Sequence, residues 1–415
     1  MDEQSQHGWL HVVGVGEQGV QELPAATRRL LENAQTIFGS PRFLDRIAAR
    51  EGQDLRPYLS PFSRNLEAII ACRNSPTVVL ASGDPNWFGI GATLSRHVGP
   101  DEMRLHPALS SFQLAAALLH WPLEQVRCLS LHGRPVENLA RFLAPGARIL
   151  ALTGSARTLG QVRDLLLAAN LPETRLSILE NLGGEQQVIH EMVAADPLPA
   201  IGDFYVLAIH CPDRLQADYL ARVPGLSDHL FRHDGQLTKR QVRAATLAHL
   251  APFPGALLWD LGAGSGSIGI EWMRAAAGAR ATCVEINSER CANIRHNAGA
   301  LGVPALEVVC ADSAQWLASR DVSTLPDAIF LGASLTDEPL FETCLKALRP
   351  GGRLVANAVT VAAQQALLAR QARLGGELSS LSVASLGSIG SHRAMKPALP
   401  VLQWCLTKSQ GGEET

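Results

Sequence analysis

The chain has 415 residues, a length that predicts two or three domains at about 150 residues each. It is 47% hydrophobic and carries 36 basic against 39 acidic residues, a net charge of −3. It can therefore bury large cores, and it has no general basic excess for binding nucleic acid. The eight cysteines stand singly with no Cys-x-x-Cys pair, so we expect neither a zinc ribbon nor a redox pair, and no metal.

Export and membrane insertion are not expected either. The first residues, Met1–His7, are polar and acidic and lack the basic and apolar parts of a signal peptide. No apolar run reaches the roughly 18 residues that suggest a membrane span. We therefore expect a soluble cytoplasmic protein that does not act at a membrane.

Strand-like and helix-like stretches alternate along the chain, which predicts α/β architecture with parallel sheets. In the first half, strands are expected at residues 9–13, 36–38, 77–81, 148–152 and 204–209. The alternation lapses at residues 211–235, which are rich in Pro, Asp, Arg and His. We interpret this stretch as a linker between a domain at 1–210 and a second domain at 236–415.

A second α/β series follows the linker. A helix is expected at residues 239–250, then strands at 256–259, 281–284, 306–309, 328–330 and 353–356. Two closing segments, 378–384 and 399–406, have no helix between them, and we predict a loop at 387–400. They must therefore be antiparallel neighbours, because a parallel pair needs a crossover connection.

The first glycine loop, Gly14-Val15-Gly16-Glu17-Gln18-Gly19, follows a strand and matches Gly-x-Gly-x-x-Gly. A dinucleotide-binding fold would need an acid at the end of the next strand. That strand ends in Gly39-Ser40-Pro41 instead. The loop alone leaves two interpretations open, a ligand loop or a tight strand-to-helix turn.

The second glycine loop is Asp260-Leu261-Gly262-Ala263-Gly264-Ser265-Gly266. Asp260, Glu285 and Asp312 lie at the ends of three consecutive predicted strands. Asp260 can meet a cationic group and would repel a pyrophosphate. Glu285 can accept ribose hydroxyls and Asp312 an adenine amine, although Asp312 can equally be a helix N-cap before Ser313.

This arrangement resembles the Rossmann-like class of S-adenosylmethionine-dependent methyltransferases, and the closing antiparallel pair resembles their last two strands. Thr238-Lys239-Arg240 and Asn357-Ala358-Val359-Thr360 are similar to the corrinoid branch of that class, over roughly residues 230–408. The resemblance implies that Thr238 closes over the methionine end of the cofactor. It also implies that the glycine loop approaches the cofactor closely, through Gly262, Gly264, Ser265 and Gly266.

Three loops of the first domain resemble the tetrapyrrole methylase family, over roughly residues 8–210. They are Val12–Gly16, Ala81–Gly89 and Pro107–Gln113, and in that family they hold S-adenosylmethionine in a cleft between two α/β lobes. The resemblance implies a second cofactor site formed by Gly14, Gly16, Gly83, Asp84, Ser110 and Ser111. Asp84 can equally be a turn residue before Pro85, and Glu17 departs from the proline found in many relatives.

The two domains in this order are similar to corrinoid methyltransferases of cobalamin biosynthesis. The resemblance implies one S-adenosylmethionine per domain, a precorrin substrate with many carboxylates, and a homo-oligomer. The first domain would methylate carbon 5; the second would methylate carbon 15 and decarboxylate the ring-C acetate. The alternatives are a methyltransferase acting on another tetrapyrrole and a non-enzymatic scaffold built from methyltransferase folds.

No protein nucleophile is expected, because a reduced tetrapyrrole already supplies an enamine-like carbon and alignment is the main requirement. Decarboxylation needs a carboxylate held away from water, for which the candidates are His233, Lys239 and Arg393. Other cations nearby in the sequence pose the same choice between a substrate rim and an ordinary solvated surface: Arg232, Arg240, His392 and Lys396, with His132 and Arg134 in the first domain.

Overall fold

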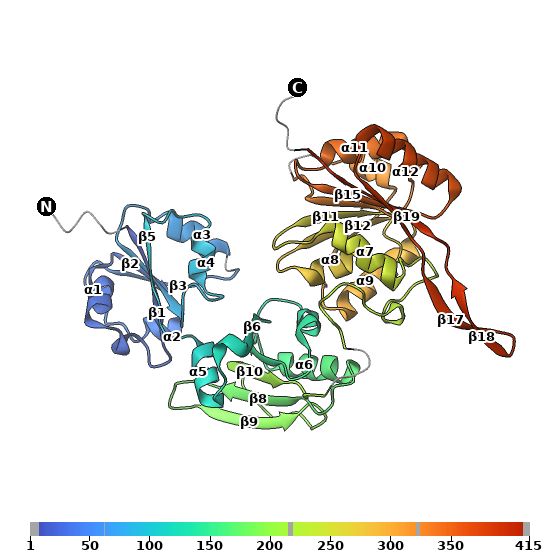
Figure 1. The fold of residues 1–415 in the computed structure, drawn as a ribbon. Helices are drawn as coiled ribbons and strands as arrows, with labels where there is room; N and C mark the ends of the chain where they lie inside the picture. Colours follow the sequence, from blue (N-terminus) through green and yellow to red (C-terminus); the bar gives the residue numbers. More distant parts are fainter. Residues whose placement is uncertain (1–7, 62, 215–218, 321–323, 410–415) are drawn as a thin grey trace. The chain divides into compact units, whose positions relative to one another are not determined.

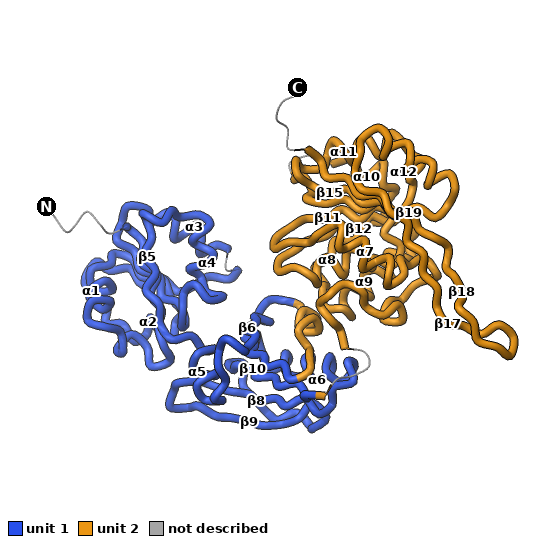
Figure 2. Tube along the Cα trace, in the orientation of Figure 1, with its two compact units in different colours: residues 1–134, 146–213 blue, residues 135–145, 214–415 orange. Residues whose placement is uncertain are grey.

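The computed structural model describes residues 8–61, 63–214, 219–320 and 324–409 (Figure 1). The segment on which the export expectation rests, residues 1–7, lies outside this range. By its internal contacts the chain divides into two compact units, Met1–Arg134 with Gly146–Asp213, and Pro135–Pro145 with Arg214–Thr415 (Figure 2). The assignment of Pro135–Pro145 to unit 2 was not predicted from the sequence, which placed all of residues 1–210 in the first domain.

The first sheet of unit 1 is wholly parallel, with strand order β3-β2-β4-β1-β5. Its central strands are apolar at nearly every position, because side chains on both faces are buried in separate core clusters. Its strands are β1 (Leu10–Val15), β2 (Thr36–Gly39), β3 (Asp54–Pro57), β4 (Thr77–Ser82) and β5 (Met103–His106). The helices of this part are α1 (Ala25–Asn33), α2 (Pro41–Leu44), α3 (Ser63–Ile70) and α4 (Ile90–Leu94), with a 3₁₀ turn at Val20–Glu22.

The second sheet of unit 1 is mixed, which corrects the prediction of parallel sheets throughout. Its order is β6-β7-β10-β8-β9, and only β6 and β7 are parallel neighbours. β8 and β9 are joined by a short connection and pair antiparallel, and β10 pairs antiparallel with the other edge of β8. The elements are α5 (Ser111–Leu119), β6 (Val126–Ser130), β7 (Arg148–Leu152), α6 (Arg157–Ala168), β8 (Arg175–Glu180), β9 (Val188–Val193) and β10 (Tyr205–His210), with a 3₁₀ turn at Leu123–Gln125.

Unit 2 contains a seven-stranded sheet with order β13-β12-β11-β14-β15-β19-β16. The first five of these strands are parallel, and the predicted closing pair is confirmed: β19 is antiparallel to both β15 and β16. The strands are β11 (Leu257–Leu261), β12 (Arg280–Glu285), β13 (Glu307–Cys310), β14 (Ala328–Leu331), β15 (Arg353–Ala358), β16 (Glu377–Leu381) and β19 (Val401–Thr407).

Helices cover both faces of this sheet, so the predicted α/β class holds for unit 2 as well. Leu258 and its neighbours pack against α7 (Arg240–Leu250), α8 (Ser267–Ala275) and α9 (Ser288–Ala300). Trp259 and Leu261 point the other way, as alternation along a strand requires. They face α10 (Ser313–Ala318), α11 (Glu338–Ala347) and α12 (Val361–Leu374). Two further 3₁₀ helices among the described residues are η4 (Val136–Phe142) and η5 (Asp228–Leu230).

The predicted loop at 387–400 is wrong, because most of it lies in a β-hairpin. Strands β17 (Ala384–Ile389) and β18 (His392–Pro397) pair only with each other and project from the sheet (Figure 1). Of the Gly and Ser residues that suggest a loop, Gly387 and Ser388 lie in β17, and Gly390, with φ +58°, and Ser391 form the hairpin turn. The longest described helix, α12, has 14 residues, and none of the described helices is apolar and long enough to cross a bilayer.

Candidate functional site

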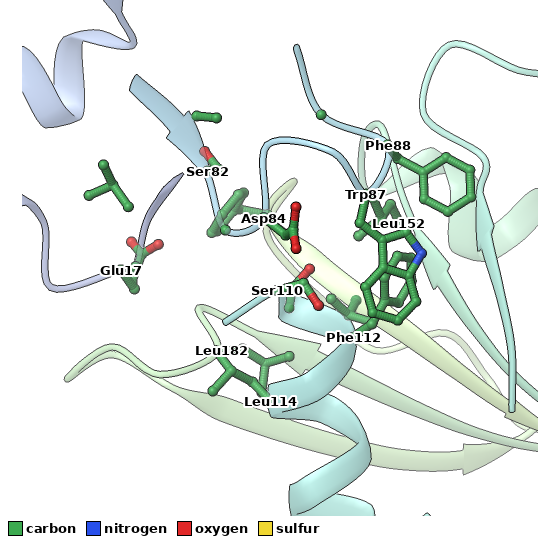
Figure 3. A pocket seen from close by; sticks show the side chains of 18 of the residues that line it. Glu17, Ser82, Asp84, Trp87, Phe88, Ser110, Phe112, Leu114, Leu152 and Leu182 are labelled. Carbon is green, nitrogen blue, oxygen red and sulfur yellow. The ribbon is translucent and has the colours of Figure 1, made fainter. Parts of the chain in front are cut away.

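Unit 1 encloses a cavity of about 700 Å³ lined by residues that follow strands of both its sheets. All three loops of the predicted site reach it, through Gly16, Gly83, Asp84, Ser110 and Ser111. In Figure 3, Glu17 lies at one side of the cavity and Trp87 and Phe88 at the other, with Asp84 and Ser110 between them. The volume is within the range of about 300–1,000 Å³ that is usual for small-molecule sites.

The glycines of unit 1 allow these loops to meet. A β-carbon on Gly14 would lie 2.3 Å from the carbonyl oxygen of Gly83 and 2.8 Å from the amide nitrogen of Ala108. Gly83 itself has φ +65°, and its β-carbon would lie 3.1 Å from the α-carbon of Ser110. Gly14 does not line the cavity; it brings the other loops together behind it.

The polar residues of the cavity also have local structural roles. Asp84 Oδ1 accepts a hydrogen bond from the Asn86 amide at 2.7 Å, the turn role considered from the sequence. Ser110 is the N-cap of α5 and forms a capping box with Gln113, and Ser111 is the first residue of the helix. Both roles leave these side chains at the cavity wall.

Several lining residues were not predicted: Phe88 lies within the second motif loop but was given no role, and Tyr58, Arg42 and Phe204 belong to segments without a motif. Phe88 has φ +58° and is 41% exposed, and its ring lies 5.9 Å from that of Phe112. Tyr58 donates a hydrogen bond to the Leu80 carbonyl at 2.7 Å, and burial raises the pKa of its hydroxyl. Arg42 and Phe204 complete the apolar and cationic part of the wall. Of the two basic candidates in unit 1, His132 lines the cavity, whereas Arg134 stacks on the Phe88 ring at 5.4 Å.

In unit 2 the glycine loop lies at the sheet edge where β11, β12 and β13 end, which is the ligand-binding edge of such sheets. Gly262, Gly264 and Gly266 all have positive φ, between +59° and +74°. Each of these glycines packs against another part of the chain. A β-carbon on Gly262 would lie 2.4 Å from the Ala333 β-carbon, one on Gly264 would lie 3.0 Å from the Gln236 carbonyl oxygen, and one on Gly266 would lie 2.7 Å from Ile294 Cγ2. The loop therefore requires glycine for its own packing.

Asp260 is placed deeper than the sequence suggests. Its side chain is 1% exposed, and Oδ2 accepts hydrogen bonds from the Gly269 amide at 3.1 Å and the Cys283 thiol at 3.6 Å. Oδ1 has no partner among the described residues. Burial raises the pKa of this carboxyl to about 7.

Glu285 lies directly beside the glycine loop, as expected. Its Oε2 accepts the Gly264 amide at 2.8 Å and its Oε1 accepts the Asn287 amide at 3.0 Å. Arg290 lies 3.9 Å from Oε1 and donates to Asp234 at 2.7 Å, which lowers the pKa of Asp234. The backbone amides thus fix the Glu285 carboxylate at the end of β12.

Asp312 caps α10, because its Oδ1 accepts the amides of Ala314 and Gln315 at 3.0 and 3.1 Å. The N-cap alternative is therefore confirmed as a structural role. Its proximity to β12 follows from the parallel pairing of β12 with β13. Whether it also contacts a ligand stays a prediction.

Residues 224–239, here called the lead-in segment, are held against the glycine loop by a buried ion pair. Arg243 of α7 is 0% exposed and donates to Glu271 of α8 at 2.6 Å, and also to the carbonyl oxygens of Leu226 and Thr238. Glu271 accepts the amide of Leu226 at 3.0 Å. The predicted cofactor residue Thr238 is thereby held by its backbone.

The three candidates for decarboxylation lie on two different segments. His233 and Lys239 are exposed on the lead-in segment, where Lys239 precedes α7 as its N-cap residue. Arg393 is exposed on β18, so it belongs to the projecting hairpin. The hairpin leaves the sheet beside the carboxyl end of β15, because Ala358 pairs with Leu402. In the described part of the chain, no group of three or more His, Cys, Asp or Glu side chains could hold a metal ion.

Both units match known family models. Residues 9–197 match the tetrapyrrole (corrin/porphyrin) methylases, and residues 229–408 match a precorrin methyltransferase domain.

The chain is also similar to full-length and partial relatives. The chain is 43% identical over 401 residues to a precorrin-6Y C(5,15)-methyltransferase [decarboxylating] of Sinorhizobium sp, covering 96% of each chain. It is 29% identical over 181 residues to a cobalt-precorrin-7 C(5)-methyltransferase of Salmonella typhimurium, covering 44% of this chain and 89% of the relative. The crystal structure of the C-terminal domain of a Rhodobacter capsulatus precorrin-6Y C5,15-methyltransferase is 39% identical, with a TM-score of 0.42 over 45% of this chain and 100% of that one.

Proposed function

Because the chain belongs to the family of decarboxylating precorrin-6Y C(5,15)-methyltransferases, we propose that it methylates precorrin-6Y at carbons 5 and 15. In the same proposal it removes CO₂ from the ring-C acetate and gives precorrin-8 in cobalamin biosynthesis. The observation that carries the proposal is the full-length match, which spans both units. An activity of only one unit would require only one of the two matched domains.

Unit 1 is proposed to methylate carbon 5. The shorter relative, which bears the name of a C(5)-methyltransferase, supports a carbon 5 reaction that needs no second domain. Unit 2 is then left with carbon 15 and the decarboxylation. The boundary proposed for this division still lies within the predicted linker at 211–235, near Asp213, because Leu226 and Phe231 of that stretch are buried in the core of unit 2.

Each unit is proposed to bind one S-adenosylmethionine, which supplies an electrophilic methyl group on a sulfonium. In unit 1 the residues that would hold it are the cavity-lining Gly16, Gly83, Asp84, Ser110 and Ser111, with Gly14 packed behind them. The cavity volume and its apolar wall fit an adenine-containing ligand.

In unit 2 the glycine loop fits the same cofactor by its chemistry. Asp260 Oδ1 and Ser265 Oγ are buried and have no partner among the described residues, so the loop offers polar atoms that its own fold does not use. The Glu285 carboxylate is fixed by two amides and has acceptor capacity left for ribose hydroxyls. Thr238, Gly262, Gly264, Gly266 and Asp312 complete the proposed set.

The chain's own contribution to methyl transfer is alignment. The carbon that accepts the methyl group must lie in line with the transferred methyl, and well-aligned intramolecular reactions gain up to roughly 7–11 kcal/mol from such positioning. In unit 1, the rings of Trp87, Phe88 and Phe112 form an apolar wall that excludes water and can lie against a macrocycle. No side chain needs to form a covalent bond.

Decarboxylation requires the ring-C acetate to be held apart from water while the macrocycle accepts the electron pair. We propose that His233, Lys239 and Arg393 take part by binding carboxylates of the substrate, because all three are exposed cations or potential cations on the segments beside the carboxyl edge of the sheet. Exposed cations are worth little as structural ion pairs, so their removal should cost activity rather than stability.

We further propose a homo-oligomer that works in the cytoplasm. The hairpin β17–β18 supports self-association, because an isolated pair of strands is marginal alone and Leu386, Ile389 and Met395 are 55–60% exposed on it. Sedimentation of the purified protein tests the oligomeric state.

The division of labour is tested by adding bulk and charge to one glycine turn at a time. Gly264→Arg should leave methylation at carbon 5 intact and abolish methylation at carbon 15 and the loss of CO₂. Gly83→Arg should do the reverse. The matched controls are Gly255→Arg and Gly52→Arg, which share the positive φ but have open space around the β-carbon.

Product masses distinguish one added methyl, two added methyls and the loss of CO₂. If Gly264→Arg and Gly83→Arg both remain folded but each loses all activity, the sites of the two units are coupled, and the proposal of independent sites is wrong. A wild-type protein that binds S-adenosylmethionine but changes no reduced tetrapyrrole would favour the scaffold alternative. Turnover of a tetrapyrrole other than precorrin-6Y would favour the other alternative.

A further inference from the structure

Glu17 and Arg42 form an ion pair in the wall of the unit 1 cavity. The two side chains meet at 2.9 Å between Arg42 Nη1 and Glu17 Oε2, with 33% and 23% of their side-chain surfaces exposed. Both residues line the cavity. Glu17 is the residue that departs from the proline of many tetrapyrrole methylases, and the first-domain motif gives it no role.

Arg42 is held in one orientation by its other contacts. Its Nη2 donates to Ser82 Oγ at 2.9 Å, and its guanidinium carbon lies 4.5 Å from the ring centres of both Phe43 and Phe204. A guanidinium stacked on aromatic rings loses little further freedom when it binds a ligand. Its two hydrogen bonds use two of five N–H groups, and the remaining three have no protein partner among the described residues.

The charge of Arg42 is unusual in this cavity. Among the lining residues, it is the one Arg or Lys, and the acidic ones are Glu17 and Asp84. An anion entering the cavity would meet two carboxylates, the His132 ring and one guanidinium, and Arg42 is the one of these groups that always carries a positive charge. Planar guanidinium groups recognise carboxylates through paired N–H donors.

We propose that Arg42 binds a carboxylate side chain of the tetrapyrrole substrate in the unit 1 cavity, and that Glu17 positions it for that contact. This inference rests on the proposed function for the identity of the substrate. The carboxylate takes N–H groups that Glu17 and Ser82 do not use. Glu17 belongs to the glycine loop, so the contact also sets the substrate's position relative to that loop.

The test compares Arg42→Gln and Arg42→Lys in the full-length protein. The matched control is Arg46→Gln, because Arg46 also contacts this loop, donating to the Glu17 carbonyl at 3.0 Å, but does not line the cavity. Loss of a hydrogen bond to a charged group should raise KM for precorrin-6Y in carbon 5 methylation by about 10- to 100-fold in Arg42→Gln. The kcat value should stay within about threefold, as expected for binding lost equally from ground and transition states. Arg42→Lys should recover part of the loss.

Two further measurements separate substrate recognition from a structural role. The dissociation constant of S-adenosylhomocysteine, taken by calorimetry, should not change in Arg42→Gln. Esterified precorrin-6Y should bind wild type more weakly than the free acid, and esterification should cost Arg42→Gln less than it costs wild type, since the partner is already gone.

A KM for Arg42→Gln equal to that of Arg46→Gln would overturn the inference. So would a parallel loss of S-adenosylhomocysteine affinity, which would mark the ion pair as a support of the glycine loop. Failure of the proposed function has a different signature, in which wild type does not methylate carbon 5. In that case absorbance titration with precorrin-6Y still decides the role of Arg42, through the ratio of wild-type to variant affinity.

Discussion

The buried carboxyl of Asp260 should oppose folding of unit 2 at neutral pH. Its pKa is about 7 in the folded protein against an ordinary value of 3.8, because burial penalises the charged form. The folded state therefore binds a proton more tightly than the unfolded state, and stability should rise as pH falls from 7 towards 3.8. Asp260→Asn should remove this dependence, because an amide oxygen can still accept the Gly269 amide.

The magnitude follows from the two pKa values. A difference of about 3 pKa units at about 1.4 kcal/mol each corresponds to a penalty of about 4 kcal/mol above pH 7. At pH 5 the Asp260 carboxyl is neutral in the folded protein and ionised in the unfolded chain. The penalty on folding is then smaller, about 1.6 kcal/mol. Asp260→Asn should thus stabilise the ligand-free protein most at pH 8, and its advantage should shrink on acidification.

Hydrogen exchange of peptides from β11 and α8 is the suitable assay, because a protein of two units need not unfold in one step. The free energy of opening should rise in the variant by about 2–4 kcal/mol at pH 8 and by less at pH 5. If the unpartnered Oδ1 meets the cationic end of S-adenosylmethionine, the same variant should bind the cofactor of unit 2 more weakly. Equal pH dependence in wild type and variant would refute the reasoning.

Three other changes test the structure of unit 2. Glu285→Ala should weaken S-adenosylmethionine binding to unit 2 about 5- to 150-fold, for a loss of roughly 1–3 kcal/mol. The affinity is measured by calorimetry in the Gly83→Arg variant, in which unit 1 should not bind the cofactor, and an unchanged affinity would remove Glu285 from the site. A fragment beginning at Asp213 should fold and bind the cofactor, and insolubility of every such fragment would contradict the proposed boundary. Adding a peptide of residues 135–145 should raise the melting temperature of the fragment, because Leu139 is 0% exposed and belongs to this unit. Glu271→Gln should lower the free energy of opening of unit 2, measured by hydrogen exchange, by about 3–5 kcal/mol, because it leaves Arg243 buried without its main counter-charge. A loss below about 1 kcal/mol would show that the other hydrogen-bond acceptors of Arg243 are enough to stabilise its buried charge.

Apolar periodicity predicted the central strands of the parallel sheets well, because these strands are buried on both faces. The strands at 148–152 and 353–356 lie within one or two residues of β7 and β15. The periodicity missed β3, β5, β6 and β9, whose residues are mostly exposed or half-buried and therefore carry no continuous apolar run. It also missed the buried strand β8, where Ser177 interrupts a short apolar run. It also missed the hairpin β17–β18, whose Gly and Ser residues have the composition of a loop.

Tertiary relationships were harder to predict than strands. The segment Pro135–Pro145 joins unit 2 through the packing of η4 on α9, where a β-carbon on Gly302 would lie 2.6 Å from the Arg141 amide nitrogen. Nothing in its composition indicates which unit it belongs to. In the same way, Arg42 follows β2 in a segment without a motif, and only folding brings it to the glycine loop.

Asp84 and Asp312 each have two interpretations from the sequence, as a cofactor-binding residue and as a turn or helix-cap residue, and the structure shows why both can hold. A carboxylate has about four acceptor positions on two oxygens. Asp84 and Asp312 each use Oδ1 for a turn or a helix cap, and Oδ2 has no protein partner in the described parts of the chain. The local role fixes the side chain at a loop that borders the site and leaves an oxygen for a ligand. For these two residues the turn or cap reading and the cofactor reading are therefore compatible, and local hydrogen bonding supplies the rigidity that a ligand contact needs.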